Sequence, residues 1–149
     1  MKFLNSKQRK HFYEQLKEQY GYEGPKELAL FEGGNNKIYA ITKALDEVPF
    51  TQMRPIQGGL YIASTESVDI RLTLDGAILL AKHCNDCFVD VNEEEKNTWM
   101  SGRNLPYQGD QHGYVLLRYQ KRIIGCGSVS SDGYIKNYVP KGRRITDPH

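Results

Sequence analysis

Cysteines and long apolar runs are both scarce in this chain. Its three cysteines, Cys84, Cys87 and Cys126, are an odd number and too few for a disulfide framework, which agrees with a reducing compartment. No window approaches the roughly 20 apolar residues that a membrane-spanning helix needs, and the N-terminal stretch MKFLNSKQRKHF becomes polar too early for a signal peptide. These absences argue against a disulfide-stapled domain and against membrane insertion, so we expect a cytoplasmic protein with no membrane partner.

A strong net charge is also absent, since the chain carries +2 at pH 7. Hydrophobic residues make up 39% of the chain and aromatic residues 11%, which is too much apolar side chain for a disordered protein. A chain of 149 residues can bury roughly 68–70% of its unfolded surface. The composition therefore predicts a globular protein with one full core or two small modules packed together.

The charges are unevenly distributed along the chain. Residues 113–149 hold two anions and seven cations, a net charge of +5, whereas residues 1–112 hold 13 cations and 16 anions, a net charge of −3. Such a field steers an anionic partner toward one end of a molecule. The seven C-terminal cations are Arg118, Lys121, Arg122, Lys136, Lys141, Arg143 and Arg144.

The first half of the sequence alternates between helical and strand patterns. Asn5 and Gln8 have the spacing of a capping box, apolar residues then repeat at helical spacing, and Gly21 is placed to end the helix. The run Gly33-Gly34-Asn35-Asn36 predicts a hairpin turn. The other elements that we expect here are strands at 27–31, 37–41, 60–63 and 68–72 and helices at 42–48 and 74–83. Together they predict a small α/β unit.

The second half is mostly β in pattern. After a buried strand at 87–91, Asn92 and Glu95 predict a second capped helix, which Gly102 ends. Strands are expected at 114–119, 122–129 and 134–138, joined by turns at 120–121 and 131–133. Short hairpin strands with one helix predict a small, partly open barrel. Since Asn85-Asp86 is the least apolar point between the halves, we predict domains at 1–84 and 85–149.

Two motifs could carry metal or nucleotide chemistry, but each has a simpler explanation. Gly125-Cys126-Gly127 lacks the third glycine and the following helix of a phosphate loop, and it is more typical of a bend or a close approach within a strand. His83, Cys84 and Cys87 could form part of a zinc or redox site, with only His112 and Cys126 left to complete it. Alternatively, both thiols are small buried residues. We expect no metal and no cofactor.

Catalytic residues are not recognisable in the sequence. Asp69, Asp75 and Asp90 are isolated from one another, and the histidines do not stand beside a carboxylate in a familiar spacing. The chain is therefore predicted not to be an enzyme, and a metal-dependent enzyme built on His83, Cys84 and Cys87 remains the weakest alternative.

Binding to nucleic acid has a clearer physical basis. Lysine and arginine side chains neutralise phosphates, tyrosine rings such as that of Tyr134 could stack on unpaired bases, and Asn137 could hydrogen-bond to a base edge or a 2′-hydroxyl. The alternative is that the tyrosines fill a core and that residues 141–144 are a solvated tail.

The C-terminal half resembles a known RNA-binding family. The sequence EEEKNTWMSGRNLPY, followed by GYVLLRYQKRIIGCGSVSSDGYIKNYVPKGRRI, is similar to the PUA-like domain at the C-terminus of ribosomal RNA cytosine-5 methyltransferases of the NOL/NOP/sun group. The resemblance covers about residues 87–145, and its most specific part is Lys-Asn-x-x-Pro-Lys, here Lys136, Asn137, Pro140 and Lys141. Residues 1–84 resemble the α/β domain that precedes the PUA domain in ribosome-biogenesis factors.

The resemblance implies an α+β fold, with a small N-terminal α/β domain packed on a C-terminal PUA-like β pseudo-barrel. It implies binding of structured RNA, ribosomal RNA before transfer RNA, in ribosome biogenesis or RNA modification. The methyltransferase's cofactor-binding unit and Pro-Cys motif are absent from the sequence, and Arg103 stands where such tails often have an acidic residue. The residues expected at the RNA are Arg103, Arg118, Lys121, Arg122, Tyr134, Lys136, Asn137, Lys141, Arg143 and Arg144.

A second class of function stays open. The chain could be a protein-interaction subunit that docks to an RNA methyltransferase or a ribosome-assembly factor without touching RNA. The salt dependence of RNA binding separates these two possibilities, because neutralised phosphates release counterions.

Overall fold

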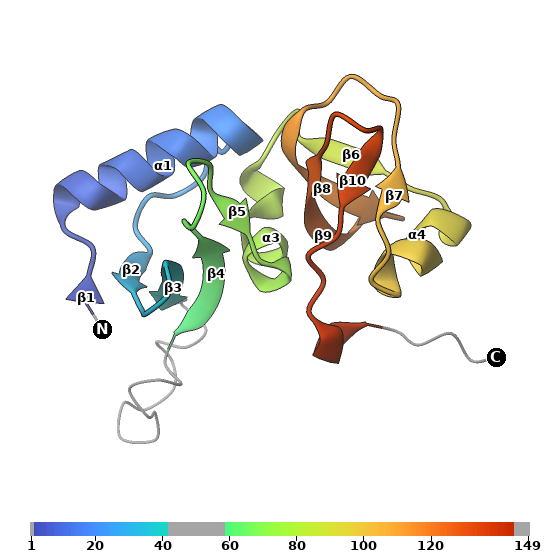
Figure 1. Cartoon of the computed structure of the whole chain (residues 1–149). Coiled ribbons are helices and arrows are strands. Elements are labelled where there is room, and N and C mark those ends of the chain that lie inside the picture. Colours follow the sequence, from blue (N-terminus) through green and yellow to red (C-terminus); the bar gives the residue numbers. More distant parts are fainter. Residues whose placement is uncertain (1, 42–58, 145–149) are drawn as a thin grey trace.

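The computed structural model describes residues 2–41 and 59–144, which form two five-stranded sheets (Figure 1). The N-terminal sheet has the order β1-β2-β3-β4-β5, with neighbouring strands antiparallel. The expected helix at 42–48 lies outside the described residues. The elements are β1 (Lys2–Phe3), α1 (Ser6–Tyr20), β2 (Ala29–Glu32), β3 (Lys37–Ile41), β4 (Leu60–Ser64), β5 (Arg71–Leu72) and α3 (Leu74–Leu80), with a 3-10 turn at Ala81–His83.

Helix α1 forms for the local reasons that its sequence predicts. The Asn5 side chain accepts a hydrogen bond from the Gln8 backbone N–H at 2.8 Å, and the Gln8 side chain accepts one from the Asn5 N–H at 2.9 Å. Gly21 ends the helix in the left-handed conformation, with φ of 63°. The buried face consists of Phe12, Tyr13, Leu16 and Tyr20.

The strand expected at 68–72 is shorter in the structure. Only Arg71 and Leu72 pair with β4. In the segment before them the Ser67 hydroxyl donates a 2.8 Å hydrogen bond to the Asp69 carbonyl, a local bond of the kind that competes with strand pairing. Val68, in the same segment, is 92% exposed. The alternating sequence pattern alone therefore overestimated the length of this strand.

The C-terminal sheet has the order β6-β8-β9-β10-β7, in which β6 and β8 are parallel and the other pairs antiparallel. Among the described strands, β6 and β7 are the two edges of this sheet and do not pair with each other, so hydrogen bonds do not close it into a barrel. Its elements are β6 (Phe88–Asp90), α4 (Glu93–Met100), β7 (Leu105–Pro106), β8 (Gly113–Tyr119), β9 (Arg122–Val129) and β10 (Tyr134–Lys136), followed by a 3-10 turn at Lys141–Arg143. The α+β class is thus confirmed.

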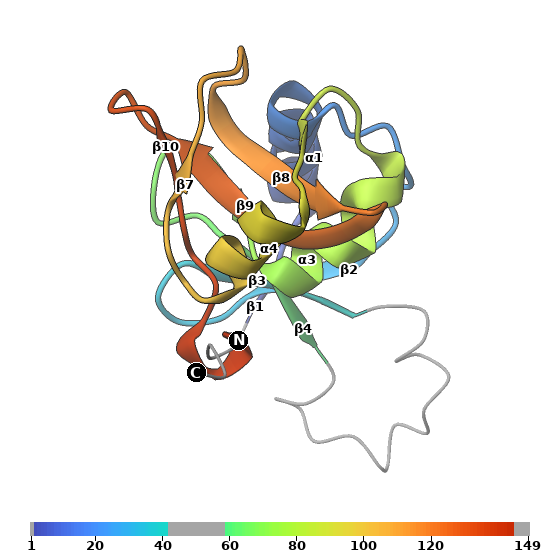
Figure 2. The ribbon, with the colours of Figure 1, turned by 90° about the vertical axis from the view of Figure 1, so that its right-hand side faces the viewer.

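The two sheets share one of the two hydrophobic cores. The larger core contains Tyr20 and Leu72 from the N-terminal half together with Leu116 and Cys126 from the C-terminal half. The Tyr20 hydroxyl donates a 2.5 Å hydrogen bond to the Ile70 carbonyl and lies 3.6 Å from the Cys126 sulfur. The second core is centred on Trp99 of α4. Figure 2 shows α4 on one face of the C-terminal sheet and α1 beyond the other. The domain boundary at residue 84 stays a prediction.

Within the described residues, no helix is long and apolar enough to cross a membrane.

Candidate nucleic-acid interface

The Gly125-Cys126-Gly127 motif serves packing beneath α4. A Cβ atom on Gly125 would lie 2.4 Å from the Trp99 indole nitrogen, and one on Gly127 would lie 2.6 Å from the same ring and 2.8 Å from the Lys136 carbonyl oxygen. The Trp99 N–H donates a 3.1 Å hydrogen bond to the Ile124 carbonyl. The two glycines thus let the ring approach β9, as expected for glycine within a strand.

Cys126, between these glycines, helps to line a cavity of about 200 Å³ where the two sheets meet. We call it the inter-sheet cavity. Tyr61, Arg71 and Asp75 line it from the N-terminal half, and Tyr138 and Arg143 from the C-terminal half. It therefore contains two guanidinium groups and one carboxylate. Burial raises the pKa of the Cys126 thiol to about 11, so this part of the cavity lining is uncharged at neutral pH.

Two cations lie close to the ring of Tyr138, which lines this cavity. The Arg71 guanidinium carbon lies 4.6 Å from the ring centroid, and the Lys136 amine lies 5.5 Å from it. The Tyr138 hydroxyl is 3.2 Å from that of Ser128. Sequence reasoning missed Arg71, because it belongs to the half with net negative charge and only the fold brings it to the C-terminal segment.

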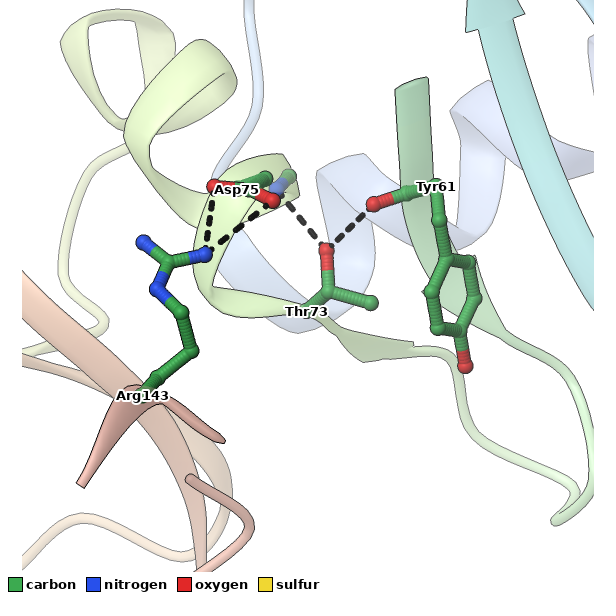
Figure 3. Close-up of polar contacts among 5 residues, drawn as sticks. Tyr61, Thr73, Asp75 and Arg143 are labelled. Atoms are coloured by element: carbon green, nitrogen blue, oxygen red, sulfur yellow. Dashed lines mark hydrogen bonds and ion pairs between the residues drawn. The ribbon is translucent and has the colours of Figure 1, made fainter. Parts of the chain in front are cut away.

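Arg143 forms an ion pair across the cavity (Figure 3). One of its terminal nitrogens donates to both carboxylate oxygens of Asp75, at 3.2 and 3.4 Å. Thr73 fixes the start of α3, because its hydroxyl donates to the Tyr61 carbonyl at 2.7 Å and accepts from the Gly76 N–H at 2.9 Å. Both partners of the ion pair are over 40% exposed, so it stabilises the fold by only ~0–1 kcal/mol.

The last described residues of the chain lie beside the loop that follows α4. Arg144 donates a 3.0 Å hydrogen bond to the Val139 carbonyl and lies against Gly102, whose φ is +96°. Arg103 donates to the Ser101 hydroxyl at 3.0 Å. Both arginines are exposed, as is Lys141. The structure therefore brings Arg103, Lys141, Arg143 and Arg144 into one region, as a binding surface would need.

Asn137 holds this region together. Its side-chain N–H groups donate to the carbonyls of Trp99 at 2.7 Å and Arg103 at 2.9 Å, and its side-chain oxygen accepts from the Val139 N–H at 2.7 Å. Strand β10 stops at Lys136 because the Asn137 backbone N–H binds the Asn104 side chain at 2.9 Å instead of a neighbouring strand. The predicted contact of Asn137 with a base stays a prediction, and the amide already has a structural role.

Lys136 lies beside one end of β9, and Lys121 and Arg122 lie at the other end. Lys136 pairs with Ser128, six residues along β9 from Arg122, which corresponds to roughly 20 Å. Lys136 is therefore distant from Lys121 and Arg122, because the register of β9 places them at opposite ends of the strand. Tyr134 and Lys136 are exposed on β10, whereas Ile135 between them is buried.

Lys121 and Arg122 belong to a second group of cations around the β8–β9 turn. With Lys82 and Arg118 they surround an open groove of about 520 Å³ whose apolar side chains are Ile78, Ala81, Phe88 and Ile123. Arg118 binds Asp90 through two hydrogen bonds of 2.7 and 3.0 Å, which hold the pKa of that carboxyl below its usual value. We call this feature the turn groove.

His83, Cys84 and Cys87 have ordinary structural surroundings. Cys84 donates to the Leu80 carbonyl at 3.3 Å, both thiols are buried and free, and the His83 ring packs edge-on against Tyr22. Among residues 2–41 and 59–144, no three histidine, cysteine or acidic side chains gather as a metal site would require.

Comparisons with known proteins identify the C-terminal half. The family model of the Methyltransferase RsmF PUA domain matches residues 88–145. Ribosomal RNA small subunit methyltransferase F of Vibrio vulnificus, from strains YJ016 and CMCP6, is 29% identical over 102 residues, which are 68% of this chain. The chain spans about a fifth of the length of these relatives, since the match covers 20% of each.

A solved structure has the same fold. A PUA domain from Aeropyrum pernix K1, crystallised as a tartrate complex, aligns with a TM-score of 0.51 and 16% identity over 91% of this chain and 73% of that one. At this identity the likeness shows the fold alone. The resemblance predicted over residues 87–145 is thus confirmed, and this part of the chain is a PUA-like domain of the kind found in ribosomal RNA methyltransferases.

Proposed function

We propose that this protein binds structured RNA, ribosomal RNA in preference to transfer RNA, in the cytoplasm. Its role would be in ribosome biogenesis or RNA modification, without catalytic activity of its own. The observation that carries this proposal is the set of exposed cations on the PUA-like domain that have no carboxylate partner within the described part of the chain. They include Arg103, Lys136, Lys141 and Arg144, together with Lys121 and Arg122 at the β8–β9 turn.

The chemistry of this surface suits an RNA backbone. Exposed, unpaired cations bind phosphates by displacing condensed counterions, which gives affinity with little sequence preference. Tyr134 is 44% exposed on the same face of β10 as Lys136, so its ring is open to an unpaired base. The proposed pseudo-barrel would present both residues beside the loop that contains Arg103.

The test is direct binding by the full chain. Fluorescence anisotropy with a labelled ribosomal RNA hairpin, a transfer RNA and a DNA duplex, each over a series of salt concentrations, should give tightest binding to the ribosomal hairpin. The affinity should fall steeply with salt. Absence of RNA binding at low salt would overturn the proposal. Transfer of a labelled methyl group to RNA by this chain alone would contradict the non-catalytic part.

The turn groove supports a second candidate, docking to an RNA methyltransferase or a ribosome-assembly factor. Its apolar side chains include Ile78, which is 54% exposed on α3, and exposed apolar patches with a polar rim are typical of protein contacts. Ile78→Asp should abolish copurification with such a partner and leave RNA affinity unchanged. If it changes neither, this second candidate fails.

A further inference from the structure

Arg71 is a half-buried cation at the boundary between the two sheets. Within residues 2–41 and 59–144, no carboxylate forms an ion pair with it. Its guanidinium lies over Tyr138 and lines the inter-sheet cavity. A partly desolvated cation is costly unless an anion or hydrogen-bond acceptor reaches it. The cavity therefore has a place for a negatively charged group beside Arg71.

Arg143 is a second cation that could bind an anion in this cavity, because its ion pair with Asp75 contributes little stability. Arg143 lines the same cavity, and its contact with Asp75 is long and more than 40% exposed, so an incoming phosphate can replace the carboxylate. Asp75 would then be free to accept a hydrogen bond from an N–H group of the ligand. The cavity thus combines two phosphate-binding groups with one acceptor.

The rest of the cavity offers apolar side chains that one ring could contact. Leu72, Val139 and the uncharged Cys126 form part of the lining. Its volume of about 200 Å³ is below the ~300–1,000 Å³ of pockets that hold drug-sized ligands, so a base pair is excluded. A nucleotide unit has the matching parts, a phosphate, a ring and ring N–H groups.

We propose that the inter-sheet cavity holds one unpaired nucleotide of the bound RNA, with its phosphate on Arg71 and Arg143 and its base against the apolar lining, where Asp75 accepts an N–H hydrogen bond. This site rests on the proposed RNA binding and deepens it. It uses Arg71 and Asp75 from the N-terminal half, so the PUA-like domain alone would lack it. The same chemistry would also fit a free nucleotide, which the experiment distinguishes.

The test compares two RNAs and matched variants of the full chain. One RNA is a hairpin with an unpaired loop, and the other is a fully paired duplex of the same stem. Arg71→Gln should weaken hairpin binding about tenfold or more, because it removes a charge-assisted contact, and should leave duplex binding nearly unchanged. Arg143→Gln, at a more exposed position, should act in the same direction. Arg9→Gln, on α1, is the control and should affect neither RNA.

Nuclear magnetic resonance locates the site independently of affinity. Amide chemical shifts of the full chain should change at residues 71–75 and 125–126 on addition of the hairpin, and not on addition of the duplex. If hairpin and duplex bind but Arg71→Gln weakens both equally or neither, the cavity proposal fails while RNA binding stands. If no RNA binds, the proposed function fails. If free mononucleotides bind saturably at these residues and RNA does not bind, the ligand of the cavity is a free nucleotide and not part of an RNA.

Discussion

The guanidinium carbon of Arg71 lies 4.6 Å from the centroid of the Tyr138 ring. This cation–π contact joins β5 of the N-terminal sheet to the segment that follows β10, and contacts of this kind contribute ~0.5–2 kcal/mol. It adds to the shared core in which Tyr20 meets Cys126. The two halves are therefore energetically linked both in the interior and at the surface.

Because the core is shared, we predict that both halves unfold together. Trp99 is the only tryptophan and reports on the C-terminal half by fluorescence, whereas far-UV circular dichroism is dominated by helix, of which α1 is the longest described. In urea the two signals should give one coincident transition. Two separate midpoints would show that the halves are independent and that their contact is weak.

The second prediction concerns the cations after Pro140. Replacing Lys141, Arg143 and Arg144 by Ala should weaken RNA binding about equally across sequences and flatten the plot of log K against log salt by roughly 0.7–0.9 per lost phosphate contact. The control is a triple Ala variant of three exposed lysines on α1, which are Lys7, Lys10 and Lys17. Equal salt slopes for the wild-type chain and the C-terminal variant would place the interface elsewhere.

The third prediction concerns Asn137. Asn137→Ala should lower the free energy of unfolding by ~1–3 kcal/mol, because it removes the side-chain partner of the Arg103 carbonyl and of the Val139 N–H. The Trp99 carbonyl loses one of its two donors and keeps the Gly102 N–H. Chemical denaturation measures this loss. Asn104→Ala removes one bond to the Asn137 backbone and should cost less. If Asn137→Ala leaves stability unchanged but alters which RNAs bind, the amide reads bases rather than holding the loop.

Sequence reasoning predicted the local features of this fold and missed the contacts between distant segments. The capping boxes at Asn5 and Asn92 were predictable because their partners lie three residues away. The turn at Gln120-Lys121 likewise has the left-handed pair that a two-residue hairpin requires. Arg71 was missed because its partner Tyr138 is 67 residues distant in the chain, and no local pattern records that contact.

The candidate site was predictable only in part, for the same reason. Charge counting found the cations from Arg118 to Arg144, since these gather in the sequence itself. It could not divide them between the inter-sheet cavity and the turn groove, because that division depends on the register of β9. Nor could it find that Arg118 and Arg143 already have carboxylate partners, which come from β6 and α3.

The fourth prediction tests the metal alternative. Cys84 and Cys87 are buried and free, so Cys84→Ala and Cys87→Ala should each cost on the order of 1 kcal/mol of stability and leave RNA affinity unchanged. Protein purified without added metal should contain less than stoichiometric zinc by elemental mass spectrometry. Stoichiometric zinc that either substitution removes would overturn this prediction.

The last prediction concerns stability at alkaline pH. Burial raises the pKa of the Cys126 thiol to about 11 in the folded protein, whereas a thiol in an unfolded chain has a pKa of ~8.5. Above that lower value the unfolded chain loses its proton while the folded chain keeps it, so ionisation favours unfolding. The stabilising effect of this thiol is therefore complete below about pH 8.5 and is lost progressively as the pH rises toward about 11.

Replacing the thiol isolates its contribution from that of the buried tyrosines. Cys126→Ala cannot ionise at this position, so its free energy of unfolding should fall less with pH than that of the wild-type chain. Between about pH 7.5 and about pH 10 the difference should be on the order of 2 kcal/mol, measured by urea denaturation at each pH. The comparison is between the changes in free energy of unfolding with pH, so the pH-independent loss of stability from the cavity that alanine leaves cancels. Parallel pH profiles would show that the Cys126 thiol is accessible to water and ionises equally in both states.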